Sequence, residues 1–240
     1  MNKRVSKISL YLTIPEPCPY LEARNSTSLV VDPEYSHSLA SISQLTRNGF
    51  RRSGNMIYRP HCDNCKSCVS VRIPVKVFRP NRSQRRVLKK NHDIVVERTN
   101  AYYDAEHFKL YLKYQKSRHP ESSMCDDDPQ RYREFLMSKN TDTWFNCFYL
   151  DNKLIAVSVI DRLDDGVSAA YTFFDPDMYT RSLGTFAILE MIKEVKSKEL
   201  DYVYLGYWIE ESEKMNYKTR FAPLEFYLNQ RWIQIKNPAS

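Results

Sequence analysis

The chain has 240 residues, of which 42% are hydrophobic and only 5 are glycine. This composition excludes a disordered protein and is enough for one or two domains with a substantial core. The 36 Lys and Arg residues outnumber the 29 Asp and Glu residues, and six of the positive charges lie within residues 79–90. A local excess of this kind favours a binding surface for an anionic partner.

The sequence contains no recognisable secretory or membrane-spanning segment. Residues 1–7 are basic, but residues 9–14 are too short and too polar for the apolar part of a signal peptide. No apolar run reaches the length needed to cross a membrane. The six cysteines are not distributed like a disulfide framework. We therefore expect a cytoplasmic protein with reduced thiols and no membrane partner.

The first part of the chain is predicted to form short strands, one helix and a hairpin. Asp32 is expected to cap the helix, with Pro33 at its first position and Gly49 at its end. A turn at residues 53–55 suits a hairpin. In chain order we predict a strand at 8–14, a strand at 29–31, a helix from 33, a hairpin at 50–58 and a strand at 69–78.

Three cysteines with C-x2-C-x2-C spacing precede the last of these strands. They are Cys62, Cys65 and Cys68, and Cys18 in a proline-rich loop could supply a fourth sulfur. Thiolates at this spacing suit a structural zinc ion or an iron–sulfur cluster. The alternative is a group of reduced thiols packed near a turn, and the spacing leaves both possibilities open.

The basic segment that follows is predicted to form a helix with one cationic face. Its charged residues recur at i, i+3, i+4, i+7 and i+8, and no acidic residue lies between positions 79 and 92. Like charges at this spacing repel unless a partner supplies anions, and a nucleic-acid backbone does so. A solvated helix surface is the alternative. The residues are Arg82, Arg85, Arg86, Lys89 and Lys90.

A boundary is expected near residue 95, where the composition becomes mixed and charged. We predict an N-terminal domain at 1–95, with the cysteines and the basic helix, and a second domain at 96–240. Asp128 is expected to cap the second of its helices, and Asp151 with Asn152 to form a two-residue hairpin turn. The second domain should contain helices at 104–117, 129–138 and 184–198, and strands at 143–150, 153–161, 167–174, 203–207 and 231–235.

This order of three antiparallel strands, a loop, a helix and a further strand is like the GNAT acyltransferase core. The overall fold class is therefore predicted to be α+β with a mostly antiparallel sheet. In GNAT proteins the loop before the helix holds the phosphates of coenzyme A with backbone N–H groups. Here the bulky Phe186 stands where that loop normally has a small residue. We therefore expect the acyl group to arrive on another carrier.

Several motifs together resemble the bacterial aspartate/glutamate leucyltransferases, the bacterial branch of the arginyl-tRNA–protein transferase family. The similarity extends over nearly the whole chain in the same order. The motifs are at residues 18–21, 49–54, 58–62, 80–86, 171–176, 182–184, 204–209 and 214–218. The resemblance implies an enzyme that transfers leucine from leucyl-tRNA to proteins with N-terminal Asp or Glu, which creates a signal for degradation. It also implies an N-terminal family domain followed by a GNAT-like domain.

The chemistry of this transfer suggests roles for several residues. An aminoacyl ester is already activated, so the transfer itself needs no cofactor, only positioning, oxyanion stabilisation and proton transfer. Donors near the ends of the core strands are candidates for catalysis: Tyr171, Tyr207, Lys214 and Tyr217. Lys218 could also donate to the oxyanion or the leaving group, and Lys214 and Lys218 could equally hold the terminal phosphates of tRNA. Candidates for binding the acidic N-terminus are Arg51, Arg52, Arg118 and His119.

Three alternatives stay open from the residues alone. Arginine could be the transferred amino acid, because the sequence does not identify the pocket that would select the amino acid on the tRNA. A coenzyme A-dependent N-acetyltransferase would also fit the GNAT-like order, although Phe186 disfavours it. A non-enzymatic RNA-binding protein with a zinc knuckle would use the cysteines and the basic helix.

Overall fold

The fold is organised around one large, mostly antiparallel sheet. The computed structural model describes residues 8–118 and 127–235. The eight strands lie in the order β14-β13-β7-β12-β11-β10-β9-β8, and only β11 and β12 run parallel. They are β7 (Val69–Pro74), β8 (Val95–Asn100), β9 (Thr143–Leu150), β10 (Lys153–Arg162), β11 (Gly166–Phe174), β12 (Tyr202–Trp208), β13 (Glu225–Leu228) and β14 (Arg231–Gln234).

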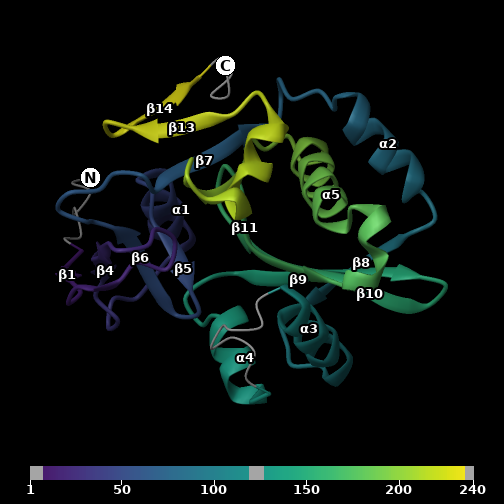
Figure 1. Ribbon diagram of the computed structural model, residues 1–240, viewed down its shortest axis with the longest axis horizontal. Helices are drawn as coiled ribbons and strands as arrows, with labels where there is room; N and C mark the ends of the chain where they lie inside the picture. The colour runs from purple at the N-terminus through teal and green to yellow at the C-terminus, as the bar shows by residue number, and fades with distance from the viewer. Residues whose placement is uncertain (1–7, 119–126, 236–240) are drawn as a thin grey trace, which may run out of the picture.

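Helices cover both faces of this sheet (Figure 1). On one face α5 (Leu183–Ser197) packs against the sheet, and α2 (Arg82–Lys90) packs against α5. On the other face lie α3 (Ala105–Arg118) and α4 (Pro129–Leu136). Separate apolar clusters fill the two sides, one built around Val71 and Ile192 and the other around Leu110 and Phe173. Burial of these clusters supplies the main driving force for folding.

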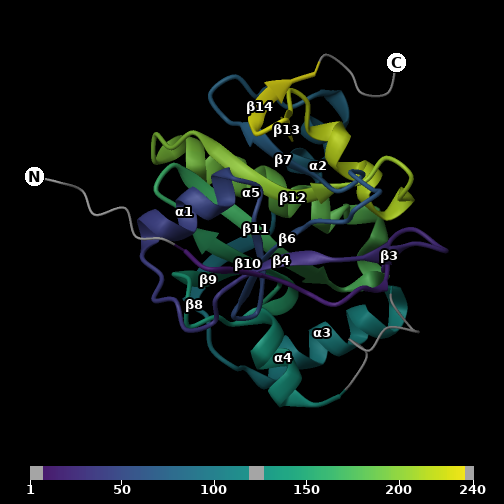
Figure 2. The ribbon, with the colours of Figure 1, turned by 90° about the vertical axis from the view of Figure 1, so that its left-hand side faces the viewer.

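A smaller four-stranded sheet lies beside the large one, as Figure 2 shows. Its strands have the order β1-β4-β6-β5, and α1 (Leu39–Arg47) packs next to it. The strands are β1 (Leu10–Leu12), β4 (Ser28–Val31), β5 (Arg51–Ser53) and β6 (Met56–Pro60). Between β1 and β4 the chain forms a two-stranded ribbon of β2 (Glu16–Pro17) and β3 (Asn25–Ser26). The described part of the chain also has two 3-10 helices, η2 (Pro176–Arg181) and η3 (Glu213–Phe221).

The predicted fold class is confirmed, and most predicted elements are present. The hairpin at Asp151 and Asn152 forms with both residues at positive φ, 49° and 60°. Asp128 caps α4 by accepting a hydrogen bond from the backbone N–H of Gln130. The GNAT-like order is also seen, because antiparallel β9, β10 and β11 are followed by α5 and the parallel strand β12.

The elements differ from the predicted ones at three places. The first helix starts at Leu39, not Pro33, because Asp32 forms a local turn with Glu34 and Ser38 caps the helix instead. Residues 95–100, which suggested a boundary, form the edge strand β8. Strand β13 was not predicted.

The large sheet also crosses the predicted division at residue 95. Strand β7 comes from the N-terminal part of the chain but lies between β12 and β13. It pairs with β12 over Val69–Pro74 and contributes Val71 and Ile73 to the core. The division at residue 95 stays a prediction, and the two parts share one sheet.

A buried ion pair joins the small sheet to the large one. The Arg52 Nε lies 2.7 Å from an Asp161 carboxylate oxygen, and the side chains are 5% and 3% exposed. The Thr143 hydroxyl donates to the same carboxylate at 2.6 Å, and Arg52 also donates to the carbonyl of Leu136. A charge buried in this way is costly to leave without its partner.

We expect the substitution Asp161→Ala to lower the free energy of unfolding by about 3–5 kcal/mol, because it leaves the Arg52 guanidinium buried and uncompensated. Urea unfolding at neutral pH measures this change. Asp142→Ala is a matched control, since it breaks an Asp142–Arg162 pair whose side chains are 62% and 61% exposed. The control should lose no more than about 1 kcal/mol, and an equal effect of both substitutions would contradict the prediction.

Candidate functional site

The two parallel strands of the large sheet separate in the middle of the molecule. Pairing between β11 and β12 runs only from Gly166 opposite Tyr202 to Ser168 opposite Tyr204, although both strands continue. The register of β11 against β10 shifts at Ala170, and that of β12 against β7 shifts at Leu205. Irregularities of this kind bend strands and end pairing. The separation therefore leaves backbone groups of both strands available to other partners.

Arg51 enters this separation from the small sheet. Its Nη2 donates a hydrogen bond of 3.0 Å to the carbonyl oxygen of Ala170, the residue at the irregularity of β11. Its guanidinium carbon lies 5.9 Å from the centre of the Tyr207 ring on β12. Among the residues that the structure describes, no carboxylate forms an ion pair with Arg51. The cation thus sits between the strands with donors left for a ligand.

Gly206 makes room for this arginine. Its φ is +76°, a conformation that disfavours L side chains. A Cβ atom added there would lie 2.0 Å from Nη1 of Arg51. The backbone conformation therefore favours glycine at this position, and a Cβ atom there would displace the Arg51 guanidinium.

Lys218 approaches the same place from η3 and is almost completely buried, at 3% exposed. Its Nζ donates a hydrogen bond to the carbonyl of Tyr207. Burial, and to a smaller extent the Arg51 charge, lower the pKa of Lys218 well below its usual range. The amine is therefore a candidate base. This burial disfavours the predicted contact between Lys218 and tRNA phosphates.

Tyr217 lies beside Lys218 and is 41% exposed. The Lys218 Nζ is 5.8 Å from the centre of its ring. Burial raises the pKa of Tyr217, and the nearby Arg51 charge opposes that rise. We call Arg51, Ala170, Gly206, Tyr217 and Lys218 the divergence site.

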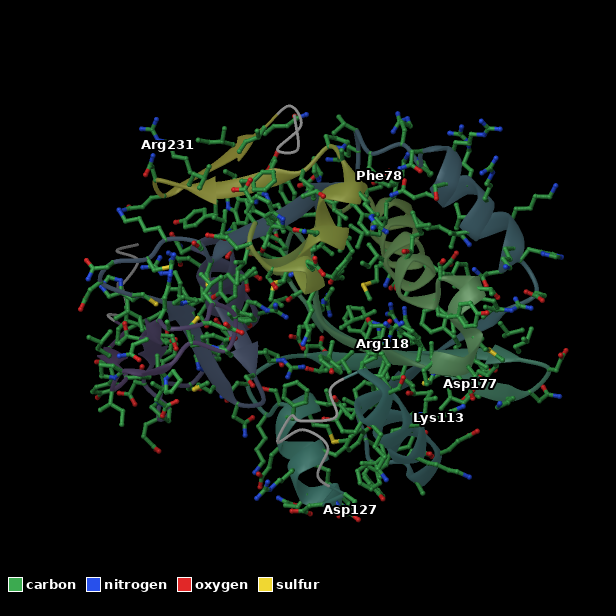
Figure 3. All side chains as sticks on the ribbon, viewed as in Figure 1. Phe78, Lys113, Arg118, Asp127, Asp177 and Arg231 are labelled. Atoms are coloured by element: carbon green, nitrogen blue, oxygen red, sulfur yellow. The ribbon has the colours of Figure 1, made fainter. Side chains whose placement is uncertain are left out.

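Helix α3 brings a second cation toward this region. In Figure 3 Arg118 extends toward the middle of the molecule, whereas Lys113 and Asp177 lie together at its side. The guanidinium carbon of Arg118 is 5.9 Å from the centre of the Phe174 ring, at the end of β11. The same ring contacts Tyr114, whose pKa burial raises and Arg118 lowers. His119, the neighbour predicted to bind the acceptor, lies outside the described residues.

Two of the predicted catalytic tyrosines have other partners. The Tyr207 hydroxyl is buried and donates to the backbone carbonyls of Gly49 and Tyr58 at 3.0 and 3.2 Å. The Tyr171 hydroxyl accepts a hydrogen bond from Gln115, and its ring packs on Phe135 on the α3 and α4 side of the sheet. Tyr207 therefore anchors the small sheet, and Tyr171 is part of the core on the opposite face.

Two predicted cations also lie away from the divergence site. Arg52 points to the opposite side of β5 from Arg51, and buried Asp161 already compensates its charge. Lys214 is on the exposed part of η3. The direction of Arg52 follows from backbone geometry, because adjacent strand residues face opposite ways.

The four predicted metal ligands lie near one another, next to the divergence site. Burial raises the pKa of Cys68 to about 12, and Cys18, Cys62 and Cys65 add to the rise. Cys65 has a lowered pKa, caused mainly by hydrogen bonds from Ser67. Within residues 8–118 and 127–235, no three His, Cys, Asp or Glu side chains are arranged to hold a metal ion.

The basic helix has the cationic surface that its sequence predicts. Its charged residues are exposed, whereas Gln84 is buried and Val87 and Leu88 pack toward α5. Asn81 caps the helix, and Gln84 completes the capping box. Among the described residues, no carboxylate pairs with the five exposed cations of α2: Arg82, Arg85, Arg86, Lys89 and Lys90.

The loop before α5 is closed, but not by the residue that the sequence suggested. Phe186 points into the core, where its ring centre is 5.8 Å from that of Phe148. The end of α2 covers the loop instead, because Lys90 and Asn91 donate to the carbonyls of Thr180 and Arg181. Arg181 in turn binds Asp93 at 2.8 Å.

Sequence reasoning did not identify Ala170, Gly206 or Tyr114 as parts of this region. The one available signal was Gly206 in the motif at 204–209. A glycine inside a strand often marks a bulge or the close approach of another group. The role of Ala170 depends on its carbonyl and could not be predicted from its side chain.

Comparison with known proteins identifies the family. Residues 16–86 match the family model for the N terminus of arginine-tRNA-protein transferase, and residues 106–228 match the model for its C terminus. Aspartate/glutamate leucyltransferase from Teredinibacter turnerae is 44% identical over 233 residues, which cover 97% of this chain and 96% of that protein. The protein of the same name from Marinobacter nauticus is 45% identical, with coverage of 94% and 95%.

Two solved structures have a lower similarity. One is the C-terminal domain of a protein described as a lysylphosphatidylglycerol synthetase from Agrobacterium fabrum, with 12% identity and a TM-score of 0.49. The other is L-PGS from Bacillus licheniformis, with 7% identity and a TM-score of 0.43. The matches cover 82% and 59% of this chain, and 65% and 45% of those chains.

The family models and the relatives agree over almost the entire length. The two models match different parts of the chain in their expected order, and the relatives exceed 40% identity with both proteins nearly fully covered. The chain therefore belongs to the arginine-tRNA-protein transferase family and is an aminoacyltransferase.

Proposed function

We propose that the protein transfers leucine from leucyl-tRNA to the N-terminal Asp or Glu of acceptor proteins. The observation that carries this proposal is the full-length similarity to aspartate/glutamate leucyltransferases. The new peptide bond joins the leucyl carbonyl to the acceptor α-amine, and the tRNA ribose hydroxyl leaves. The bulky N-terminal leucine marks the product for degradation. We place the reaction in the cytoplasm, where charged tRNA and reduced thiols occur together.

We assign the acidic side chain of the acceptor to Arg51, with Arg118 as a second cation. Arg51 uses one donor on the Ala170 carbonyl and keeps others for a carboxylate. The Arg51 guanidinium lies between β11 and β12, and the backbone of Gly206 packs directly against it. This packing limits the orientations that the guanidinium can adopt. A bound Asp or Glu side chain would place the acceptor α-amine near Lys218. Tyr217 would donate a proton to the oxyanion or to the leaving hydroxyl.

Lys218 acts in this proposal as the general base. The acceptor amine must lose a proton to attack the ester, and its ordinary pKa is about 7.7–8.0. Burial lowers the pKa of Lys218, so this amine loses its own proton more readily than an exposed lysine and can then accept one from the acceptor amine. The carbonyl of Tyr207 holds the amine in place.

We assign tRNA binding to the basic face of α2. The support is its uncompensated charge and its exposure, since Lys and Arg bind phosphates and displace condensed counterions. The helix packs on α5, so the rigid core fixes the position of this face.

The four cysteines are proposed to hold a structural zinc ion or an iron–sulfur cluster, with no part in the transfer itself. The support is their mutual proximity, since the neighbouring sulfurs raise the pKa of Cys68. A bound cation would favour the thiolates and draw them together. Tyr20 is near both this group and the divergence site, because its pKa, which burial raises, also responds to the charges of Arg51 and Cys68.

A transfer assay tests the function. Radiolabelled leucine should move from leucyl-tRNA to peptides that begin with Asp or Glu, but not to a peptide that begins with Ala. Arginyl-tRNA assayed in parallel distinguishes arginine transfer, and acetyl-CoA tests the acetyltransferase alternative. Absence of transfer from both charged tRNAs would refute the proposal.

The pH dependence of transfer tests Lys218. For the wild type, kcat/KM should rise steeply with pH, because both Lys218 and the acceptor amine must lose a proton. Lys218→Met should lower kcat by about 10²–10⁴-fold and leave the shallower rise of the acceptor amine alone. Lys193→Met on the exposed surface of α5 is the control. An unchanged profile in Lys218→Met would exclude the base role.

Metal analysis of protein purified without oxygen tests the cysteines. Zinc or iron should be present, and the double substitution Cys62→Ala with Cys65→Ala should remove most of it. Cys147→Ala is the control, because this buried thiol lies elsewhere, beside His107. If the wild-type protein contains no zinc or iron, the proposed metal site is wrong and the four cysteines are a group of reduced thiols.

A further inference from the structure

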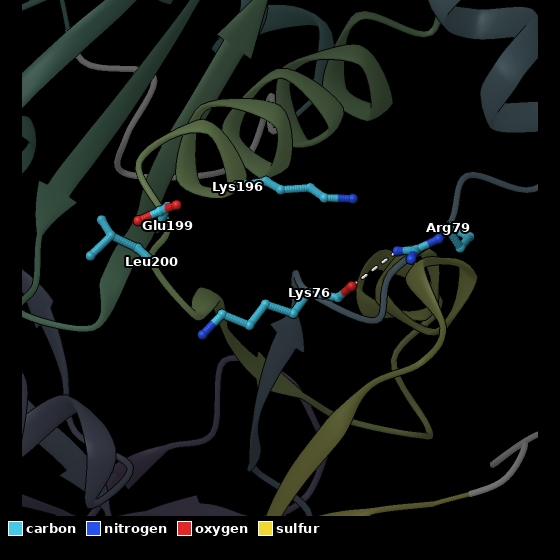
Figure 4. Close-up of a pocket in the computed structure, with 5 residues that line it drawn as sticks. All are labelled: Lys76, Arg79, Lys196, Glu199 and Leu200. Atoms are coloured by element: carbon cyan, nitrogen blue, oxygen red, sulfur yellow. Dashed lines mark hydrogen bonds between the residues drawn. The ribbon is translucent and has the colours of Figure 1, made fainter.

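A basic pocket lies beyond the divergence site, at the other end of β12. Its volume is about 510 Å³, and Figure 4 shows the side chains around it. Lys76 follows β7, Arg79 precedes α2, and Lys196 is on the last turn of α5. Glu199 and Leu200 in the turn after α5 complete the lining. The connection between β7 and α2 and the end of α5 thus bring three cations to one hollow.

The charges of this pocket are largely available to a ligand. Lys76 pairs with Asp201 at 2.5 Å, but within the described residues no carboxylate pairs with Arg79 or Lys196. Arg79 is fixed by two hydrogen bonds from its Nη1, to the carbonyls of Lys76 and Phe78 at 3.0 and 2.8 Å. A guanidinium held by backbone carbonyls keeps its full charge and loses little entropy when it binds an anion.

Glu199 lies directly after α5 in a backbone conformation that its side chain does not favour. It follows the Lys198 C-cap of α5 with φ of +57°, the left-handed conformation in which helices usually place glycine. A glutamate there is less favourable than glycine, and the structure shows no ion pair for it among the described residues. Its carboxylate therefore stands beside the cations as a hydrogen-bond acceptor.

The pocket continues the basic surface of α2, because Arg79 is three residues before Arg82. It is also remote from the chemistry. It lies before the first residue of β12, whereas Gly206 and Tyr207 are near the end of that strand. At roughly 3.3 Å per residue, this places the pocket about 15–20 Å from the divergence site. A single ligand that contacts both the pocket and the divergence site would have to be a polymer.

We propose that this pocket binds one nucleotide of the tRNA backbone, several nucleotides away from the esterified end. Arg79 and Lys196 bind its phosphate, and Glu199 accepts a hydrogen bond from a ribose 2′-hydroxyl. The carboxylate gives the pocket a preference for RNA over DNA, because DNA lacks this donor and would bring only phosphate charge. The inference rests on the proposed tRNA substrate and adds a second contact beyond α2.

Binding of uncharged tRNA at several salt concentrations tests the phosphate contact. The double substitution Arg79→Ala with Lys196→Ala should weaken binding about tenfold and reduce the slope of log affinity against log salt by about 1–2. Lys193→Ala is the matched control, because it removes a charge from the same helix outside the pocket, where Lys193 pairs with Glu190. Arg85→Ala with Arg86→Ala provides the reference for loss of α2 contacts.

A DNA strand with the tRNA sequence tests the role of Glu199. Glu199→Ala removes a negative charge and should strengthen binding of both polymers through electrostatics. The ratio of RNA to DNA affinity isolates the hydroxyl contact, and it should fall about threefold to tenfold, as expected for one hydrogen bond. Glu199→Gln, which keeps an acceptor oxygen, should retain most of the ratio. Melting curves of all variants verify that they are folded.

These outcomes separate the inference from the proposed function. If wild-type protein transfers leucine but the Arg79 and Lys196 variant binds tRNA with the wild-type salt slope, the pocket assignment is wrong and the function stands. If Glu199→Ala leaves the ratio of RNA to DNA affinity unchanged, the proposed contact between Glu199 and the 2′-hydroxyl is wrong. If the wild-type protein transfers no amino acid from any charged tRNA, the proposed function fails whatever the pocket binds.

Discussion

The separation of β11 and β12 around the Arg51 guanidinium is the constraint on which the site depends. Two parallel strands that stop pairing in mid-sheet expose carbonyl and N–H groups, and such groups need partners. Here Arg51 provides a donor for the Ala170 carbonyl, and Lys218 provides one for the Tyr207 carbonyl. The gap is thus filled by the protein's own cations and becomes a place for an anionic substrate group.

This arrangement requires both parts of the chain. Arg51 belongs to the small sheet, whereas the strands that it separates and the η3 helix follow later in the sequence. Buried Tyr207 fixes the small sheet by donating to Gly49 and Tyr58, and the Arg52–Asp161 pair fixes it from the other side. Adjacent arginines on one short strand therefore have different tasks, since Arg51 faces the site and Arg52 holds the framework.

Sequence patterns predicted elements whose determinants are local. The alternation and turn residues of β9 and β10, the cap at Asp128 and the charge periodicity of α2 each involve neighbours a few positions apart, and each was confirmed. Strand β8 was missed because it is an edge strand with charged residues on its exposed positions. The start of α1 was misplaced because Asp32 and Ser38 are both suitable caps, and only the local turn at Asp32 decides between them.

The site was predicted less completely, for reasons of geometry. Lys214 and Lys218 would share a face of an α-helix, but the 3-10 conformation of η3, with fewer residues per turn, places Lys218 inside and leaves Lys214 exposed. The facing direction of Arg51 and Arg52 depends on strand pairing between distant segments. The sequence left two roles open for Lys218, in the transfer chemistry or on tRNA phosphates, and it did not predict the burial of this lysine, because buried lysines are rare.

The central position of β7 has a consequence for how such a protein can be assembled. This strand precedes the GNAT-like core in the sequence, yet it bridges β12 and β13 in the sheet. A polypeptide that began after residue 95 would lack the strand between β12 and β13. The edges of both strands would then be unpaired and prone to aggregation. Any exchange of the second half as an independent module would therefore have to include this strand.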